Sequence, residues 1–326
     1  MQKPEQAGAL LQKTEHSDFQ VVVPGKWILA GEHAVLRGSE ALVFPLFSKF
    51  LKLIYTAGIS ELEINIAGQN RQEIELIIWS VLERAFKILN IKRSQVHGIL
   101  EIQSSIALGG GMGASATLCV ALTEWLQHLG YIQKSELFNF ARDLENLFHG
   151  ESSGVDVAVT LNRKPLAFTR NSGFTELSIA AQVNLYLSYS GERGVTKDCI
   201  EKVKALIETQ PELAKKIDLQ MDESSSALKN LLAQASTSPS ALTGKLPTVS
   251  DAATLHSWSN AIRKSNQCFE QWGLITENVK QHQAKLIEAG ALAVKLTGSG
   301  GGGYVLSLWP SNPPEKLPFE MIACFA

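Results

Sequence analysis

The sequence lacks both a strong excess of charge and a long apolar run. Thirty lysine and arginine residues stand against thirty-two aspartate and glutamate residues, which gives a net charge of −2. A chain without a basic field is poorly suited to nucleic acid or to an anionic membrane as its main partner. No stretch of about 18 uncharged apolar residues is present, so no segment is expected to span a membrane. Residues 1–20 lack the apolar core of a signal peptide, and residues 1–15 are expected to form a frayed extension.

Cysteine is also scarce. The four cysteines, Cys119, Cys199, Cys268 and Cys324, lie far apart and show none of the paired spacings of a metal site. Cys119 stands among apolar residues that favour a helix, so we interpret it as a small core residue rather than a nucleophile. Scattered cysteines of this kind fit a reducing compartment, and a cytoplasmic location is expected.

The size and composition of the chain predict two globular domains. It has 326 residues, of which 45% are hydrophobic and 19% charged. Domains usually contain about 100–200 residues, and this hydrophobic content is enough for a large core. The polar segment 169–176 contains Gly173 and is the expected boundary, which gives domains of residues 1–175 and 176–326.

Hydrophobic periodicity predicts an early β region followed by a largely helical second half. Strands, mostly antiparallel in the first part, are expected over residues 19–24, 27–30, 41–47, 50–55, 61–66, 97–103, 166–168, 183–190, 291–297 and 304–309, with a Pro-Gly turn between the first two. Helices are expected over residues 72–89, 114–129, 134–148, 155–161, 196–208, 212–234, 252–272 and 276–289. Residues 235–247, rich in Ser, Thr and Pro, are expected to form a loop.

The most informative segment is LGGGMGASAT, residues 108–117, where glycines stand directly before a helix-forming run. A helix N-terminus presents unpaired N–H groups and the positive end of the helix dipole, so the expected guest is an anion, usually phosphate. The alternative is a flexible turn that precedes a helix. The segment lacks the lysine of a Walker A loop, and its glycines do not have the spacing of a dinucleotide-binding fingerprint. A second run, GSGGGG at residues 298–303, has more glycine than a hairpin requires.

Two further segments carry polar residues in apolar surroundings. In LENLFHGESSGVDVAV, residues 144–159, Glu145 and Asp156 are either active carboxylates or ordinary residues of solvated helix ends. In PGKWILAGEHAVLRG, residues 24–38, Lys26 is either a functional cation or an edge-strand lysine that reaches water. The ordinary explanation is reasonable for each segment alone, but it accounts poorly for the presence of all of these segments in one chain.

Together the segments resemble the three signature motifs of the GHMP kinases, the superfamily of galactokinase, homoserine kinase, mevalonate kinase and phosphomevalonate kinase. The three are PGKWILAGEHAVLRG, SSIALGGGMGASAT and KLTGSGGGG, and they span residues 24–303. The first is most similar to the PGKxxLxGEHAVxxG of mevalonate kinases, because phosphomevalonate kinases tend to carry tyrosine at His33 and galactokinases arginine at Lys26. The segment from Glu145 to Asp156 is similar to the mevalonate kinase pattern E…HGxPSGxD.

The resemblance implies a role for each motif. Asp156 would polarise the substrate hydroxyl or accept its proton, and Lys26 beside it would stabilise the carboxylate and the transferring phosphoryl group. Glu145 and Ser115 would bind Mg²⁺. The ATP phosphates would lie on Gly109, Gly110, Gly111, Met112, Gly113, Ala114 and Ser115. The acceptor pocket would contain Lys26, Glu32, His33, Asp156, Arg193, Thr196, Thr297 and Gly298. Phosphoryl transfer depends mostly on positioning and charge neutralisation, which such residues can supply.

Three positions depart from the superfamily pattern. Ala114 replaces the first of two serines, Ala107 stands where a proline usually precedes the loop, and Ser152 stands where the turn before Asp156 usually has proline. None of the three removes a group that the chemistry requires, but all three bear on nucleotide affinity.

The resemblance implies the two-domain α+β GHMP kinase fold, with a left-handed βαβ crossover in the N-terminal domain and a ferredoxin-like C-terminal domain. It implies ATP- and Mg²⁺-dependent phosphorylation of mevalonate to 5-phosphomevalonate, in the mevalonate route to isoprenoids. One alternative is phosphomevalonate kinase or another small-alcohol kinase, for which Lys49, Lys52 and Arg193 could serve a phosphorylated acceptor. Another is a non-catalytic nucleotide-binding sensor. The sequence leaves open the oligomeric state, including a homodimer, and feedback inhibition by isoprenoid diphosphates.

Overall fold

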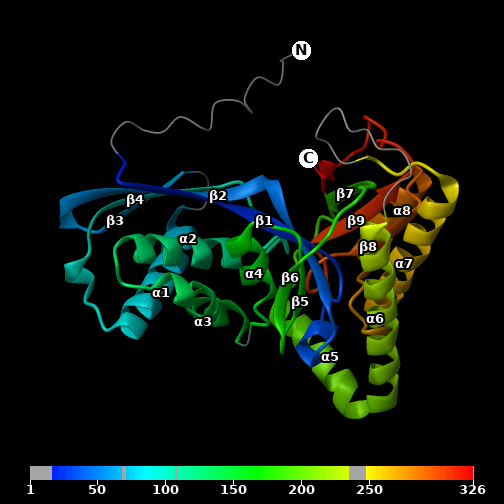
Figure 1. Ribbon diagram of the computed structural model, residues 1–326, viewed down its shortest axis with the longest axis horizontal. Coiled ribbons are helices and arrows are strands. Elements are labelled where there is room, and N and C mark those ends of the chain that lie inside the picture. Colours follow the sequence, from blue (N-terminus) through cyan, green and yellow to red (C-terminus); the bar gives the residue numbers. More distant parts are fainter. Residues whose placement is uncertain (1–16, 68–70, 107–108, 151, 235–246, 326) are drawn as a thin grey trace.

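The computed structural model describes residues 17–67, 71–106, 109–150, 152–234 and 247–325. The expected extension at residues 1–15, the positions Ala107 and Leu108, and residues 235–246 of the expected loop lie outside these ranges. Two sheets lie one after the other along the longest axis (Figure 1). Within the described ranges, no helix has the length and apolar character needed to cross a membrane.

The first sheet contains β1 to β6. The order of the strands is β3-β4-β2-β5-β6, with β1 paired to β2. The bounds are β1 Phe19–Ala30, β2 Ala41–Glu61, β3 Glu63–Ala67, β4 His97–Ser104, β5 Leu166–Thr169 and β6 Gly173–Glu176. Among the described strands of this sheet, β3 and β4 alone pair in parallel, and helix α1 (Arg71–Leu89) connects them, as parallel strands need a long crossover.

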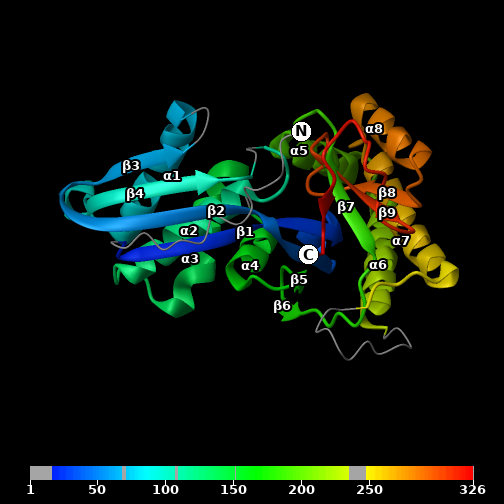
Figure 2. The ribbon, with the colours of Figure 1, turned by 90° about the horizontal axis from the view of Figure 1, so that it is seen from above.

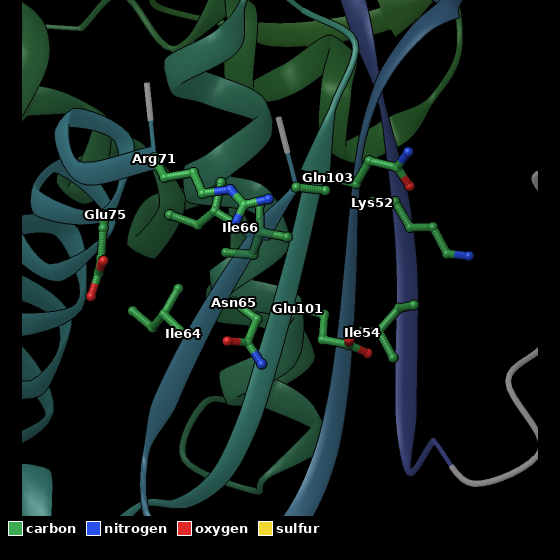
Figure 3. A pocket seen from close by; sticks show the side chains of 11 residues that line it. Lys52, Ile54, Ile64, Asn65, Ile66, Arg71, Glu75, Glu101 and Gln103 are labelled. Carbon is green, nitrogen blue, oxygen red and sulfur yellow. The ribbon is translucent and has the colours of Figure 1, made fainter. Parts of the chain in front are cut away.

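Helices cover one face of this sheet (Figures 1 and 2). They are α1, α2 (Ala114–His128), α3 (Leu137–His149) and α4 (Val155–Asn162). Successive side chains of a strand point to opposite faces, so Leu53 and Tyr55 of β2 pack under these helices with Trp125 of α2. The opposite face carries Lys52 and Ile54 beside a shallow hollow of about 610 Å³ (Figure 3).

The second sheet is antiparallel, with the order β10-β7-β9-β8. Its strands are β7 Asn184–Tyr189, β8 Ala293–Leu296, β9 Tyr304–Trp309 and β10 Ile322–Ala323, and the helices of this half are α5 Thr196–Thr209, α6 Pro211–Ala233, α7 Ala252–Gln271 and α8 Glu277–Glu288. The side chain of Asp251 accepts a hydrogen bond from the Thr254 N–H group and caps α7. An antiparallel sheet packed with helices agrees with the ferredoxin-like expectation.

The strands of the first sheet extend into two segments that the sequence analysis did not assign to a strand. The predicted Pro-Gly turn is wrong. Strand β1 continues through Pro24 and Gly25, and its register against β2 shifts between these two residues. A bulge tolerates a proline that cannot donate to the ladder. Residues 173–176 of the polar segment form β6, which pairs with β5. The chain changes sheets between residues 176 and 184, while the division into domains at residue 175 stays a prediction.

The two sheets share one hydrophobic cluster. Trp27 and Phe44, from the ends of β1 and β2, stack with ring centroids 4.4 Å apart and belong to the same cluster as Leu187, Phe269 and Leu306 of the second half. Polar contacts join the halves too: Arg37 pairs with Asp218 at 2.5 Å, and Lys229 with Glu40 at 2.7 Å. The end of β1 and the turn after it are thereby fixed between the two halves.

Candidate active site

A pocket of about 500 Å³ lies where the end of β1, the start of α2, the turn between α3 and α4 and the glycine run before β9 come together. It brings together most of the residues predicted from the sequence. These are Lys26, Glu32, His33, Gly109, Gly111, Gly113, Ala114, Ser115, Glu145, Asp156, Arg193, Thr196, Thr297 and Gly298.

Lys26 and Asp156 form an ion pair in this pocket, with Nζ and Oδ2 3.0 Å apart. Lys26 lies on β1 and is 3% exposed, and its backbone N–H group donates to the carbonyl of Met112. Asp156 lies in the first turn of α4, which begins directly after Gly154 with its φ of 85°, and about a fifth of the Asp156 side chain is exposed. The carboxylate is therefore held beside a cation and still open to the pocket.

The glycine loop before α2 is shaped by the lysine. Gly113 has a φ of 78°, and a Cβ there would lie 2.7 Å from Cγ of Lys26. Only glycine allows both this backbone conformation and the passage of the lysine side chain. Met112 does not line the pocket, because its side chain is 1% exposed and packs in the core. Gly110 is likewise buried outside the lining.

The second glycine run faces the first across the pocket. A Cβ on Gly298 would lie 3.4 Å from the Gly111 carbonyl oxygen, and one on Gly303 would lie 3.0 Å from that of Gly110. Both runs have positive φ angles at these positions, apart from Gly110. The pocket is thus walled on two sides by backbone, with the N-terminus of α2 opening into it, as an anion site would require.

Glu145 of α3 lines the pocket and is only 1% exposed. The hydroxyl of Ser152 donates a hydrogen bond to its Oε2 atom. Burial raises the pKa of Glu145 to about 8, and the negative charge of Asp156 acts in the same direction. Ser152 and Lys26 oppose this rise in the pKa by stabilising the charged form.

Glu32 lines the pocket but is engaged elsewhere. Its Oε1 atom lies 2.5 Å from Nζ of Lys295, and both side chains are buried. Burial raises the pKa of Glu32 and lowers that of Lys295, while the charge of each partner counteracts the shift of the other. The sequence analysis gave Lys295 no role. The signal was a lysine within the apolar strand ALAVKL, where a buried cation needs an acidic partner.

His33 holds the second glycine run to the first motif. It has a φ of 55°, rare for a residue other than glycine, and its Nε2–H group donates to the Ser299 carbonyl at 2.8 Å. Its ring packs against Trp272, with centroids 5.2 Å apart. Burial lowers the pKa of His33 to about 4, so the ring is neutral near pH 7.

Of the three cations considered for a phosphorylated acceptor, only Arg193 lines this pocket. Lys49 pairs with Glu320 at 3.0 Å, and Lys52 lies at the hollow on the open face of the first sheet (Figure 3). Thr196 lies within hydrogen-bonding distance of the Ser299 hydroxyl, at 3.2 Å.

The oxygen donors of the pocket suit a hard cation that also binds phosphate. Glu145, Asp156 and Ser115 share its lining. Among the described residues, no group of three or more His, Cys, Asp or Glu is arranged to hold a metal. Mg²⁺ usually binds through one or two carboxylates together with substrate phosphates and water, so the donor set fits Mg²⁺ better than a metal that needs a complete protein cage.

Known proteins are similar to this chain in sequence and in fold. The family model described as "GHMP kinases N terminal domain" matches residues 77–164, and the one described as "GHMP kinases C terminal" matches residues 240–323. The mevalonate kinase of Aeropyrum pernix is 26% identical over 310 residues, covering 90% of this chain and 89% of its own.

Solved structures agree in fold. The L. major mevalonate kinase in complex with R-mevalonate superposes with a TM-score of 0.71 at 20% identity, covering 92% of this chain and 90% of its own. The Streptococcus pneumoniae phosphomevalonate kinase in complex with phosphomevalonate and AMPPNP gives a TM-score of 0.65 at 16% identity, covering 90% and 92%. Matches in both halves of the chain, joined to a fold of the same kind, show that the chain belongs to the GHMP kinase family.

Proposed function

We propose that this chain transfers the γ-phosphoryl group of ATP to the primary hydroxyl of mevalonate, giving 5-phosphomevalonate and ADP. The observation that carries the proposal is the Lys26–Asp156 pair, set between the start of α2 and the second glycine run. Curated relatives named mevalonate kinase that align over about nine-tenths of the chain support the choice of acceptor.

Asp156 is the proposed base. Its carboxylate is open to the pocket and can accept the proton of an alcohol placed beside it. Lys26, 3.0 Å away, keeps a positive charge where negative charge collects on the transferring phosphoryl group. Two adjacent side chains would thus act together: Asp156 accepts the proton of the acceptor, and Lys26 stabilises the charge of the phosphoryl group.

The phosphates of ATP are proposed to lie against residues 109–115. There the positive φ angles of Gly109, Gly111 and Gly113 turn the backbone toward the pocket, and the dipole of α2 favours an anion. Ser115 and Glu145 are the proposed ligands of Mg²⁺, which when bound would neutralise the phosphate charges. Family membership supports the use of ATP, and the oxygen donors of the pocket support Mg²⁺.

The acceptor is proposed to lie beside Asp156, near His33, Thr196, Thr297 and Gly298. Glu32 contributes there through its ion pair with Lys295, which shapes the wall of the pocket. Lys49 and Lys52 lie outside the pocket. Of the three cations considered for the phosphate of a phosphorylated acceptor, the pocket therefore contains only Arg193. This favours an acceptor that is not itself phosphorylated.

An ADP-release assay with purified protein tests the proposal. Mevalonate, phosphomevalonate, homoserine and galactose are compared, each with ATP and Mg²⁺. We expect turnover with mevalonate and at most traces with the others. Turnover confined to another acceptor would overturn the choice of mevalonate, and ATP binding without any turnover would favour the non-catalytic sensor.

A further inference from the structure

Ser152 occupies a place where three hydrogen bonds meet. Its hydroxyl donates to Oε2 of Glu145 and accepts from the backbone N–H group of Gly154 at 3.0 Å. Its own backbone N–H group donates to Oδ1 of Asn146 at 2.8 Å. The residue therefore ties two neighbouring side chains near the end of α3 to the turn from which α4 starts.

This position is the one at which the sequence departs from the proline of the family pattern. A proline has no hydroxyl and no N–H group, so it could donate neither the bond to Glu145 nor the bond to Asn146. The bond to Glu145 therefore requires a hydroxyl at this position, whereas the bond to Asn146 requires only a residue other than proline. Both Ser152 and Glu145 are largely shielded from water, at 9% and 1% exposed, so the bond between them is protected from competition by solvent.

The two oxygens of Glu145 are in different situations. Oε2 is held by Ser152, whereas Oε1 accepts no hydrogen bond from any residue that the structure describes. Glu145 nevertheless lines the pocket with Asp156 and Ser115. A carboxylate fixed through one oxygen can offer the other in a constant orientation.

We propose that Ser152 is a positioning residue, which orients Glu145 so that its free oxygen meets the divalent cation of the nucleotide. The inference rests on the proposed function, in which Glu145 is a cation ligand. Hydrogen bonds to a ligating carboxylate usually act on metal affinity, because they fix the direction of the ligand before the metal arrives. Ser152 thus acts through Glu145 and has no direct part in phosphoryl transfer.

Mn²⁺ binding tests this role without any turnover. The affinity is measured from the electron paramagnetic resonance signal of free Mn²⁺, with full-length protein, a non-hydrolysable ATP analogue and no acceptor. We expect Ser152→Ala to weaken Mn²⁺ binding by about tenfold. Ser152→Thr, which keeps the hydroxyl, is expected to bind Mn²⁺ within about threefold of the unchanged protein.

Thr160→Val is the matched control. Thr160 is fully buried in α4, and its hydroxyl donates to the backbone carbonyl of Asp156 at 2.8 Å without touching Glu145. Its loss removes a buried hydroxyl near the pocket and should leave the Mn²⁺ affinity unchanged. Should Ser152→Ala not fold, Ser152→Cys, which has a weaker donor of similar size, gives the same comparison.

Steady-state kinetics give a second readout. For Ser152→Ala we expect the Mg²⁺ concentration for half-maximal rate to rise by about tenfold, with kcat at saturating Mg²⁺ retained within about threefold. Equal Mn²⁺ affinity of Ser152→Ala and the unchanged protein would overturn the proposal, as would an equal loss in Thr160→Val. Since the Mn²⁺ measurement uses no acceptor, the choice of mevalonate stands or falls separately in the ADP-release assay.

Discussion

Glu32 of the first signature motif and Lys295 of the third form an ion pair, 2.5 Å between Oε1 and Nζ, with both side chains buried between the halves of the chain. Lys295 also lies 3.4 Å from the Ile28 carbonyl, and Thr297 donates to that same carbonyl at 2.9 Å. Strand β8 is thereby attached to β1, which carries Lys26. The geometry of the pocket depends on this attachment.

Lys295→Met should strongly destabilise the protein. The change leaves Glu32 charged and unpaired in the interior, which typically costs about 3–5 kcal/mol. Urea denaturation measures the loss in the free energy of unfolding. Combining Lys295→Met with Glu32→Gln should restore part of the loss, because no charge is then left unpaired. Lys164→Met is the control: Lys164 pairs with Glu176 on the surface, and its loss should cost less than about 1 kcal/mol. Similar losses in the two lysine variants would contradict the assigned burial of the pair.

Asp156→Asn and Lys26→Met should reduce kcat by at least about 100-fold while ATP still binds. Each removes one of the two charges that the proposed reaction uses, and methionine keeps the Cγ atom that lies against Gly113. Steady-state kinetics and nucleotide titration by calorimetry separate the two effects. Asp143→Asn, an exposed position on α3, should leave kcat unchanged. Near-normal turnover in either pocket variant would remove that residue from its role.

Gly113→Ala should impair catalysis beyond its effect on stability. The new Cβ would meet Cγ of Lys26 at 2.7 Å and displace the lysine from Asp156, so we expect kcat to fall by about tenfold or more. Gly130→Ala provides the comparison, because Gly130 has a similar φ of 82° and nothing within 4 Å of the added carbon. In both variants the free energy of unfolding should fall by about 1–2 kcal/mol, because alanine is strained in the left-handed backbone conformation. If kcat falls equally in both, the contact with Lys26 is not the reason.

His33 should make the protein less stable in mild acid. Its pKa is about 4 in the folded protein, against 6.5 for an ordinary histidine, so below about pH 6.5 the unfolded chain binds a proton that the folded chain does not. The resulting loss of stability begins near pH 6.5, grows as the pH falls and is complete below about pH 4, and between pH 7 and pH 4.5 it amounts to about 2 kcal/mol.

His33→Asn, which tolerates the positive φ, removes this titration. Urea denaturation of both proteins near pH 7 and near pH 4.5 measures the difference. The free energy of unfolding of the unchanged protein should fall more steeply with acid than that of the variant. Parallel pH profiles would show that His33 does not titrate with a lowered pKa.

Much of the secondary structure could be predicted from the sequence. The helix expected over residues 114–129 is α2, Ala114–His128, because glycine before it and apolar spacing within it are local signals. Local signals did not predict that β1 runs through Pro24 or that residues 173–176 form β6, and both have a common cause. A bulge and a hairpin strand are stabilised by the neighbouring strand, and the local residues alone resemble a turn or a linker.

The sequence by itself determined the kinds of groups present: two glycine runs, a lysine in the first motif and the carboxylates of Glu145 and Asp156, together with their resemblance to one family. Which of these groups meet depends on the fold. It set Lys26 3.0 Å from Asp156, 130 positions further along the chain, and gave Lys295 and Ser152 their partners. A charged group or a hydroxyl acquires a defined partner once burial excludes the water that would otherwise compete for its hydrogen bonds.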